Sequence, residues 1–279
     1  MMEILLYIFS GIIQGLLEWI PVSSKSNLVI FLMHFGNFSL SSAFNIAIML
    51  HIGTVIAAIV YFRKDIIELL KPQVIKSLFS RSPSHDFYRN KSRYLKFLIV
   101  VLFFTFLIMG PLYLLFRTSL DQLNLSVILL AIGLLLIAVG YFQYRSRKTR
   151  EREVNFSNKN ATVLGVLQGL TIIPGISRSG MTTSTLLFEG FNAEDAFKIS
   201  FLLSIPTVII GEVGLAIING FVLSGNILLG ILISGFIGYF MIDVIIRLAK
   251  KVDFSYFCMG LGFIYLLIYL LSIIFNFVL

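Results

Sequence analysis

The stretch Pro174-Gly175-Ile176-Ser177-Arg178-Ser179-Gly180-Met181-Thr182 decides the fold, because it places an arginine inside a long apolar segment, residues 162–190. A charge in such a segment is costly unless it meets a partner, a ligand or water. The two glycines allow close backbone approach, and the proline ends the preceding helix. An arginine with hydroxyls and open backbone N–H groups is typical of a phosphate site. The alternative is a kinked helix whose arginine pairs with a buried glutamate.

The composition indicates a membrane protein. Of the 279 residues, 58% are hydrophobic and 13% are charged, and the mean hydropathy is +0.95. A soluble domain of this length could not bury so much apolar surface, so we predict an all-α polytopic membrane protein. The net charge of +8 comes from basic loops between spans. Membrane lipids, and no nucleic acid, are therefore the expected partners.

Six apolar runs are long enough to cross a bilayer, and two more are interrupted by polar turns. The expected spans are residues 42–62, 95–116, 123–144, 196–220, 226–248 and 254–278. The interrupted segments are 3–35, broken at 21–27, and 162–190, broken at the stretch quoted above. Each of their arms is short for a span, so both are predicted to be re-entrant helix–loop–helix segments.

The second half of the chain repeats the first. The turn Pro21, Ser24, Lys25, Ser26 aligns with Pro174, Ser177, Arg178, Ser179, and residues 43–56 align with 196–209. Within one integral-membrane domain, 1–279, we therefore predict two repeats, 1–144 and 162–279, each with one re-entrant hairpin and three spans. Since three is odd, the second repeat is inverted, and the two turns can meet near the midplane. Chance similarity of apolar segments is the alternative, but it does not explain matching prolines, serines and basic residues.

Basic residues predict the orientation. With both hairpins re-entrant, nearly all lysines and arginines outside the two turns fall on one side, mainly in loops 63–94 and 145–161. The positive-inside rule makes that side cytoplasmic, so both termini are expected outside the cell membrane.

A carboxylate stands close to the first turn. Gln14 and Glu18 are four residues apart and share a helix face. Near Lys25 and Arg178, Glu18 can accept a proton from a nucleophile or water, or bind a divalent cation such as Mg²⁺ or Ca²⁺. A structural Glu–Arg pair is the alternative. Ser24 is a candidate nucleophile or phosphate donor, or simply a helix cap. Two cations in an apolar surround predict a site for a lipid phosphate or diphosphate.

Two motifs carry a family resemblance. Residues 14–24, QGLLEWIPVSS, resemble the first motif of the BacA/UppP family of undecaprenyl-diphosphate phosphatases, and residues 174–182 match its second motif, PGxSRSGxT. The resemblance covers essentially the whole chain. It implies an integral-membrane hydrolase that removes the terminal phosphate of a polyprenyl diphosphate. This reaction regenerates the lipid carrier for cell-envelope and peptidoglycan synthesis and gives bacitracin resistance. A homodimer is a candidate assembly.

The resemblance also assigns roles to individual residues. It implies that Gln14 and Glu18 are the paired amide and acid, with a divalent ion on Glu18 as a candidate, and that Ser24 is the nucleophile. Our catalytic candidates are Glu18, Ser24 and Arg178. The substrate-binding candidates are Gln14, Lys25, Asn27, Ser177, Ser179, Thr182 and His51.

One position departs from the family pattern. Three residues after Ser24 the family usually has a histidine, and this chain has Asn27, which cannot accept a proton at neutral pH. Lys25 is also unusual there. Three explanations stay open: Glu18 activates Ser24 or water, another base such as His51 replaces the histidine, or the activity is weak or absent. An ordinary structural role is the alternative for His51, and His34 is expected to face outward.

Two functions from other classes compete with the phosphatase. The inverted repeat and the missing histidine favour a non-catalytic polyprenyl-phosphate binder or flippase, whereas the arginine motif and Glu18 favour the enzyme. A transporter of small anions is a third candidate, which the lack of a wide polar lining disfavours.

Overall fold

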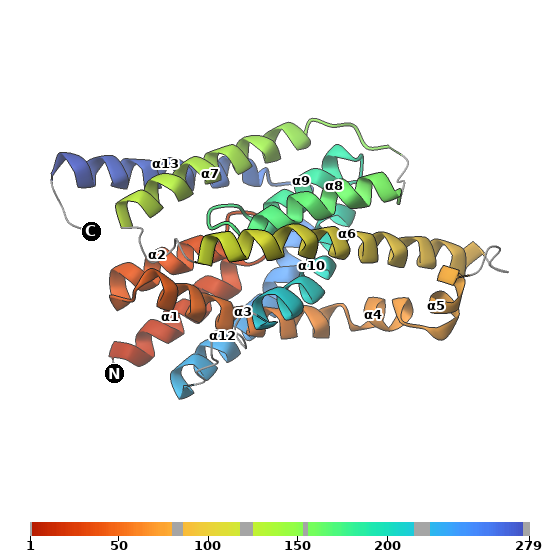
Figure 1. The fold of residues 1–279 in the computed structure, drawn as a ribbon, viewed down its shortest axis with the longest axis horizontal. Coiled ribbons are helices and arrows are strands. Elements are labelled where there is room, and N and C mark those ends of the chain that lie inside the picture. The colour runs from red at the N-terminus through yellow and green to blue at the C-terminus, as the bar shows by residue number, and fades with distance from the viewer. Residues whose placement is uncertain (1, 80–85, 118–124, 153–155, 215–223, 276–279) are drawn as a thin grey trace.

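A computed structural model of the chain describes residues 2–79, 86–117, 125–152, 156–214 and 224–275 (Figure 1). Every regular element in these ranges is a helix, which confirms the all-α class. Parts of our predictions lie outside the described residues: the span ends 123–124, 215–220 and 276–278, and the loop residues 80–85 and 153–155.

Within the described residues, five helices are long and apolar enough to cross a membrane, so the chain is a multi-pass membrane protein. They are α3 (Leu40–Tyr61), α6 (Asp86–Arg117), α7 (Leu125–Ser146), α12 (Gly225–Leu248) and α13 (Phe254–Ile274). A sixth span was expected over 196–220. There the structure has α10 (Ala193–Thr207), continued by a π-helical turn, η3 (Val208–Val213).

The interrupted segments fold as pairs of shorter helices. The first pair is α1 (Met2–Leu17) and α2 (Ser24–Gly36), which pack against each other. The second pair is α8 (Asn158–Gly169) and α9 (Arg178–Phe188), with a 3₁₀ turn, η2 (Leu170–Ile172), after α8. Both breaks lie where the sequence predicted polar turns, and these turns carry the site residues.

The predicted loop 63–94 is partly helical, so that prediction was wrong in detail. Residues there form α4 (Arg63–Leu69) and α5 (Pro72–Phe79), and α6 already begins at Asp86. The segment is charged, but apolar side chains recur at helical spacing, and Leu69 and Val74 are buried. Packing of one apolar face therefore stabilises short helices within a polar segment.

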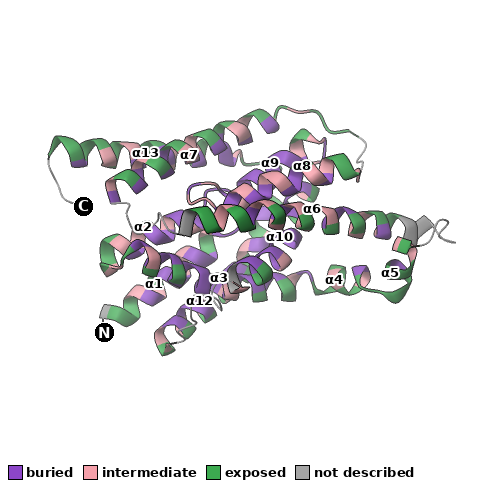
Figure 2. Cartoon of the chain, viewed as in Figure 1, coloured by how far each residue is buried: buried purple, intermediate pink, exposed green. Residues whose placement is uncertain are grey.

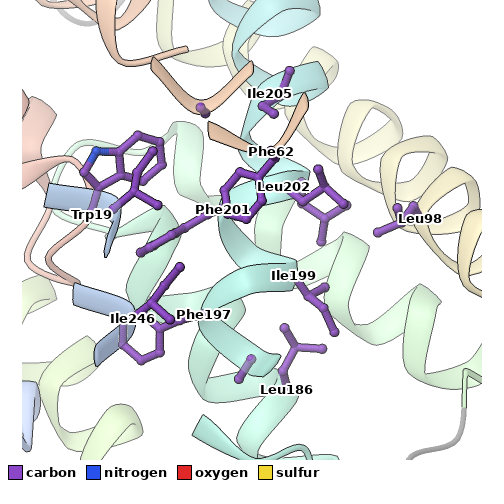
Figure 3. Close-up of a cluster of buried hydrophobic side chains, with 14 of the residues drawn as sticks. Trp19, Phe62, Leu98, Leu186, Phe197, Ile199, Phe201, Leu202, Ile205 and Ile246 are labelled. Carbon is purple, nitrogen blue, oxygen red and sulfur yellow. The ribbon is translucent and has the colours of Figure 1, made fainter. Parts of the chain in front are cut away.

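Buried residues concentrate where α3, α10 and α12 meet, whereas α6 and α13 keep long exposed faces (Figure 2). α10 supplies Phe197 and Phe201 to a large apolar cluster (Figure 3). The ring of Trp19 packs on Phe201 with centroids 4.8 Å apart. Because Trp19 directly follows Glu18, this contact fixes the first polar turn against α10.

A surface ion pair links α10 to the segment after α12. Glu194 in the first turn of α10 accepts hydrogen bonds from Lys198 Nζ at 2.6 Å and Lys250 Nζ at 2.9 Å. These hydrogen bonds hold the pKa of Glu194 at about 2. The group is exposed, so the pair restrains geometry more than it adds stability.

The close crossing of α3 and α12 depends on small residues. Gly53 of α3 lies against Ile231 and Gly235 of α12, and a Cβ atom at Gly53 would stand 2.1 Å from the Ile231 carbonyl oxygen. Ser234 Oγ also donates to Leu50 O at 2.8 Å across this crossing. The crossing positions His51, which lies two residues before Gly53, beside the first turn.

Replacing Gly53 by alanine is expected to destabilise the protein by about 1–3 kcal/mol, because the two backbones must move apart. Thermal unfolding of the detergent-solubilised protein measures the change. Gly260→Ala in α13 is the matched control, since nothing lies within 4 Å of its added Cβ. Equal unfolding temperatures for the two variants would show that α3 and α12 can move apart at little cost in free energy.

Candidate active site

Glu18 is the centre of a buried polar cluster. It follows α1 and is only 5% exposed. Its Oε2 atom accepts hydrogen bonds from Gln14 Nε2 at 2.8 Å and from Ser24 Oγ at 2.6 Å. Gln14 comes from the preceding turn of α1, and Ser24 is the first residue of α2. The chain break thus aims one hydroxyl directly at one carboxylate.

Arg178 reaches the same carboxylate from the other half of the chain. Its Nη2 atom donates to Glu18 Oε1 in an ion pair. Its Nη1 atom is buried and has no hydrogen-bond partner among the described residues. A buried guanidinium N–H group without a hydrogen-bond acceptor costs free energy, unless a ligand supplies the acceptor. Phosphate oxygens are suitable acceptors for it.

His51 of α3 completes the contacts of Glu18. Its Nε2 atom lies 3.1 Å from Glu18 Oε2, and its Nδ1 atom lies 2.6 Å from the carbonyl oxygen of Ala47. A carbonyl oxygen only accepts, so Nδ1 carries a hydrogen. A hydrogen bond from Nε2 to the carboxylate then requires one further proton. Glu18 and His51 together can therefore hold a proton beside Ser24.

The two polar turns contact each other directly. Gly175 N donates to Ser26 Oγ at 2.6 Å, and Ser179 Oγ donates to Ile20 O at 3.3 Å. Gly175 has a φ of +102°, which glycine adopts without strain. Ser23, just before α2, has a φ of 62°, which is uncommon for a residue with a side chain and is typical of functional turns.

A cavity of about 40 Å³ lies between the turns. Its polar lining consists of Glu18, Ser23, Ser24, Lys25, His51, Thr171, Ser177, Arg178, Ser179 and Thr207. Its apolar lining consists of Met109, Ile172, Ile176 and Val208. This volume holds only one or two water molecules, so a phosphate must displace flexible side chains such as Lys25 or Met109. Lys25 Nζ lies 5.2 Å from the centroid of the Phe44 ring.

Three of the predicted site residues do not line this cavity. Asn27 Nδ2 donates to Val22 O at 3.1 Å and to Ser23 O at 2.9 Å, and Asn27 Oδ1 accepts from the Tyr265 hydroxyl. Asn27 thus braces the turn from its far side. Thr182 Oγ1 donates to Arg178 O at 2.8 Å, and Gln14 reaches the cavity only through Glu18.

The remaining predicted residues have mixed surroundings. Ser177 caps α9 by accepting from Gly180 N at 3.1 Å, and its side chain also lines the cavity. His34 is exposed near the end of α2, as expected.

Our reasoning missed Ser23, Thr171 and Thr207. The repeat offered a signal for Thr207, because it aligns with Thr54 of the first half.

A resident divalent cation does not fit the protein groups by themselves. The described residues contain no cluster of three or more His, Cys, Asp or Glu side chains able to hold a metal ion. Of the residues that the structure describes, Glu18 is the one carboxylate lining the cavity, and its two oxygens already face four donors.

Fold and site define an integral-membrane protein with a buried polar cavity, in which an acid and a serine from one segment face an arginine from another. The chain belongs to the family described as bacitracin resistance protein BacA, whose model matches residues 7–264. This confirms the family suggested by the two motifs.

Curated relatives cover nearly the full length. A protein of Methanococcoides burtonii named undecaprenyl-diphosphatase is 41% identical over 261 residues, which are 91% of this chain and 94% of the relative. Relatives of the same name from Saccharolobus islandicus and Methanothrix thermoacetophila are 36% and 34% identical. The alignment with the Saccharolobus islandicus relative covers 88% of both chains. The alignment with the Methanothrix thermoacetophila relative covers 94% of this chain and 96% of the relative.

Proposed function

We propose that this chain is an undecaprenyl-diphosphatase-type enzyme, which hydrolyses the terminal phosphate of a polyprenyl diphosphate and regenerates the monophosphate carrier for cell-envelope synthesis. One observation carries the proposal: the Glu18 carboxylate binds the Ser24 hydroxyl and the Arg178 guanidinium at once. The names of the curated relatives support it. A lipid binder or flippase would not need a serine hydroxyl aimed at a carboxylate.

The first chemical step is attack by Ser24. The Ser24 oxygen forms a bond to the terminal phosphorus and passes its proton to Glu18 Oε2, 2.6 Å away. The bond from that phosphorus to the bridging oxygen breaks, and the lipid monophosphate leaves with the electron pair. Arg178 Nη1 and Lys25 neutralise charge on the phosphoryl oxygens, which is the main demand of phosphoryl transfer.

The second step regenerates the enzyme. The water oxygen bonds to phosphorus as the bond from phosphorus to the Ser24 oxygen breaks. Water gives one proton to the Glu18–His51 pair, the pair returns one proton to the Ser24 oxygen, and the proton taken from Ser24 in the first step leaves with the inorganic phosphate. His51 replaces the family histidine that is absent at Asn27, because it contacts the same Glu18 oxygen as Ser24.

Phosphate release by Ser24→Ala tests the nucleophile. We expect kcat for a polyprenyl diphosphate to fall by about 10³-fold, because water alone must then attack. Ser41→Ala near the start of α3 is the control, since Ser41 lies outside the cavity lining. Near-parental turnover in Ser24→Ala would mean that Glu18 activates water directly and that Ser24 only positions the phosphate.

Replacing His51 by glutamine tests whether His51 helps Glu18 to hold a proton during the reaction. Glutamine can still donate a hydrogen bond to Glu18 but cannot gain or lose a proton near neutral pH, so kcat should fall by about 10²-fold. The pH–rate profile should also lose one of its limbs. His34→Gln, on the exposed end of α2, should change neither quantity. An unaltered pH profile in His51→Gln would assign His51 a purely structural role.

The membrane arrangement is also part of the proposal. We propose that α1–α2 and α8–α9 are re-entrant hairpins of two inverted repeats, 1–144 and 162–279. The direct contact of their turns at Ser26 and Gly175 supports this. α1 begins and α13 ends at one end of the molecule, and α4 and α5 lie at the other, which supports outside termini and a cytoplasmic basic loop (Figure 1). The homodimer stays a prediction.

A further inference from the structure

A second cavity lies apart from the active site, between α4, α6 and α10. Its volume is about 250 Å³, and all of its lining side chains are leucine, isoleucine or proline. Leu98 of α6 points toward Leu202 of α10 across this space (Figure 3). At its edge Leu70 and Ile99 are 59% and 49% exposed, so the cavity opens on the outer surface of the helices. Such a lining selects an apolar occupant.

This apolar cavity shares two walls with the active-site cavity. On α6, Leu98, Leu102 and Met109 lie along one helix face; the first two line the apolar cavity and Met109 lines the active site. Leu102 and Met109 are about 10 Å apart along the axis. On α10, Pro206 lines the apolar cavity and the next residue, Thr207, lines the active site. An occupant would therefore end close to a bound phosphate.

The wall between the two cavities can adjust. Pro206 has no N–H to donate to the carbonyl of Leu202, and the π-helical turn η3 follows at once, so α10 is weakened at this point. Met109 on the facing helix is unbranched and flexible. These two features make the wall between the cavities the place where a chain from the phosphate site would meet least resistance.

A third cavity offers a competing path. It lies between α2, α7 and α13, and its volume is about 300 Å³. Its lining includes the polar side chains of Asn27 and His34, and Asn27 is held there by Tyr265. It shares only α2 with the active site, which Ser24 and Lys25 line, because neither α7 nor α13 supplies a described residue to that lining. This cavity is therefore more polar and less directly connected to the phosphate site.

We propose that the apolar cavity between α4, α6 and α10 binds the isoprene units of the polyprenyl tail that are nearest to the diphosphate. This inference rests on the proposed function, since it assigns the tail of that substrate. A cavity of about 150 Å³ accepts benzene, so 250 Å³ holds roughly two five-carbon units. The site then selects prenyl diphosphates by the first part of the tail.

Photo-crosslinking tests the location without requiring catalysis. The full-length protein in detergent is irradiated with a polyprenyl monophosphate that carries a diazirine on its second isoprene unit, and labelled residues are mapped by mass spectrometry. We expect labels within 95–102 of α6 and 202–206 of α10. Labels on α2 and α13 around Phe31 and Ile268, or labels spread evenly over the outer helix faces, would overturn the inference.

A cavity-filling variant tests the consequence for selectivity. Ile99→Trp, at the open edge, should raise KM for a C15 prenyl diphosphate at least about tenfold and leave methyl diphosphate, which carries no isoprene unit, unchanged. Leu129→Trp, in the third cavity, should leave both substrates unchanged. Equal losses with both substrates in Ile99→Trp would reject the tail site. If the parent protein hydrolyses neither substrate, the proposed function fails, and the crosslinked residues alone decide where the tail binds.

Discussion

Glu18→Gln is expected to lower kcat for phosphate release from a polyprenyl diphosphate by about 10³-fold or more. Glutamine has nearly the same shape, but it cannot take the proton of Ser24 and cannot pair with the Arg178 guanidinium. Both functions meet on Glu18, whose two oxygens divide the partners between them. A steady-state assay of inorganic phosphate, with purified protein in detergent, measures the effect.

Two controls separate chemistry from folding. Glu3→Gln makes the same chemical change at an exposed position of α1 and should keep full activity. Removing one partner of a buried ion pair often costs about 3–5 kcal/mol of stability, so the assay temperature must lie well below the Tm of the variant. Glu18→Asp keeps the charge and should retain part of the activity. Equal activity of Glu18→Gln and the parent would rule out the acid–base role.

Arg178→Lys is expected to lower kcat/KM by about 10²-fold, although the charge is kept. The guanidinium fork binds Glu18 through Nη2 and leaves Nη1 open toward the cavity, whereas a lysine ammonium is a single point charge and cannot hold both partners in this geometry. The same phosphate assay, run over a range of substrate concentrations, separates kcat from KM.

Arg247→Lys on α12 is the matched control for this change. Its side chain is 78% exposed and pairs with Asp243 on the same helix, so its replacement should not alter kcat or KM. Parental kcat/KM in Arg178→Lys would show that only charge is needed at this position and that the open Nη1 atom contributes no specific contact.

The position of the site could be predicted from sequence because its parts are local. Polar turns interrupt two apolar segments, and this pattern alone located the breaks after α1 and before α9. The i, i+4 spacing also predicted that Gln14 would lie on the same helix face as Glu18 and so could contact it. An unpaired charge inside a membrane costs so much free energy that few arrangements of the chain can bury Glu18 and Arg178 without pairing them.

Other parts depend on contacts that no local pattern encodes. Asn27 faces Tyr265 of α13 instead of the cavity, because a short turn rotates α2 by an angle that sequence spacing does not give. His51 of α3 reaches Glu18 across two helices, because α3 and α1 both pack closely on α12 at glycines. α4 and α5 were predicted as loop because charge masked a short apolar face. Long-range packing decided each of these positions.

The most direct test is multiple-turnover release of inorganic phosphate from a C55 polyprenyl diphosphate by the purified parent protein. We predict sustained release over many turnovers, with the polyprenyl monophosphate formed in equal amount. Tight binding of the lipid without phosphate release would contradict the account and would favour a carrier-lipid binder or flippase.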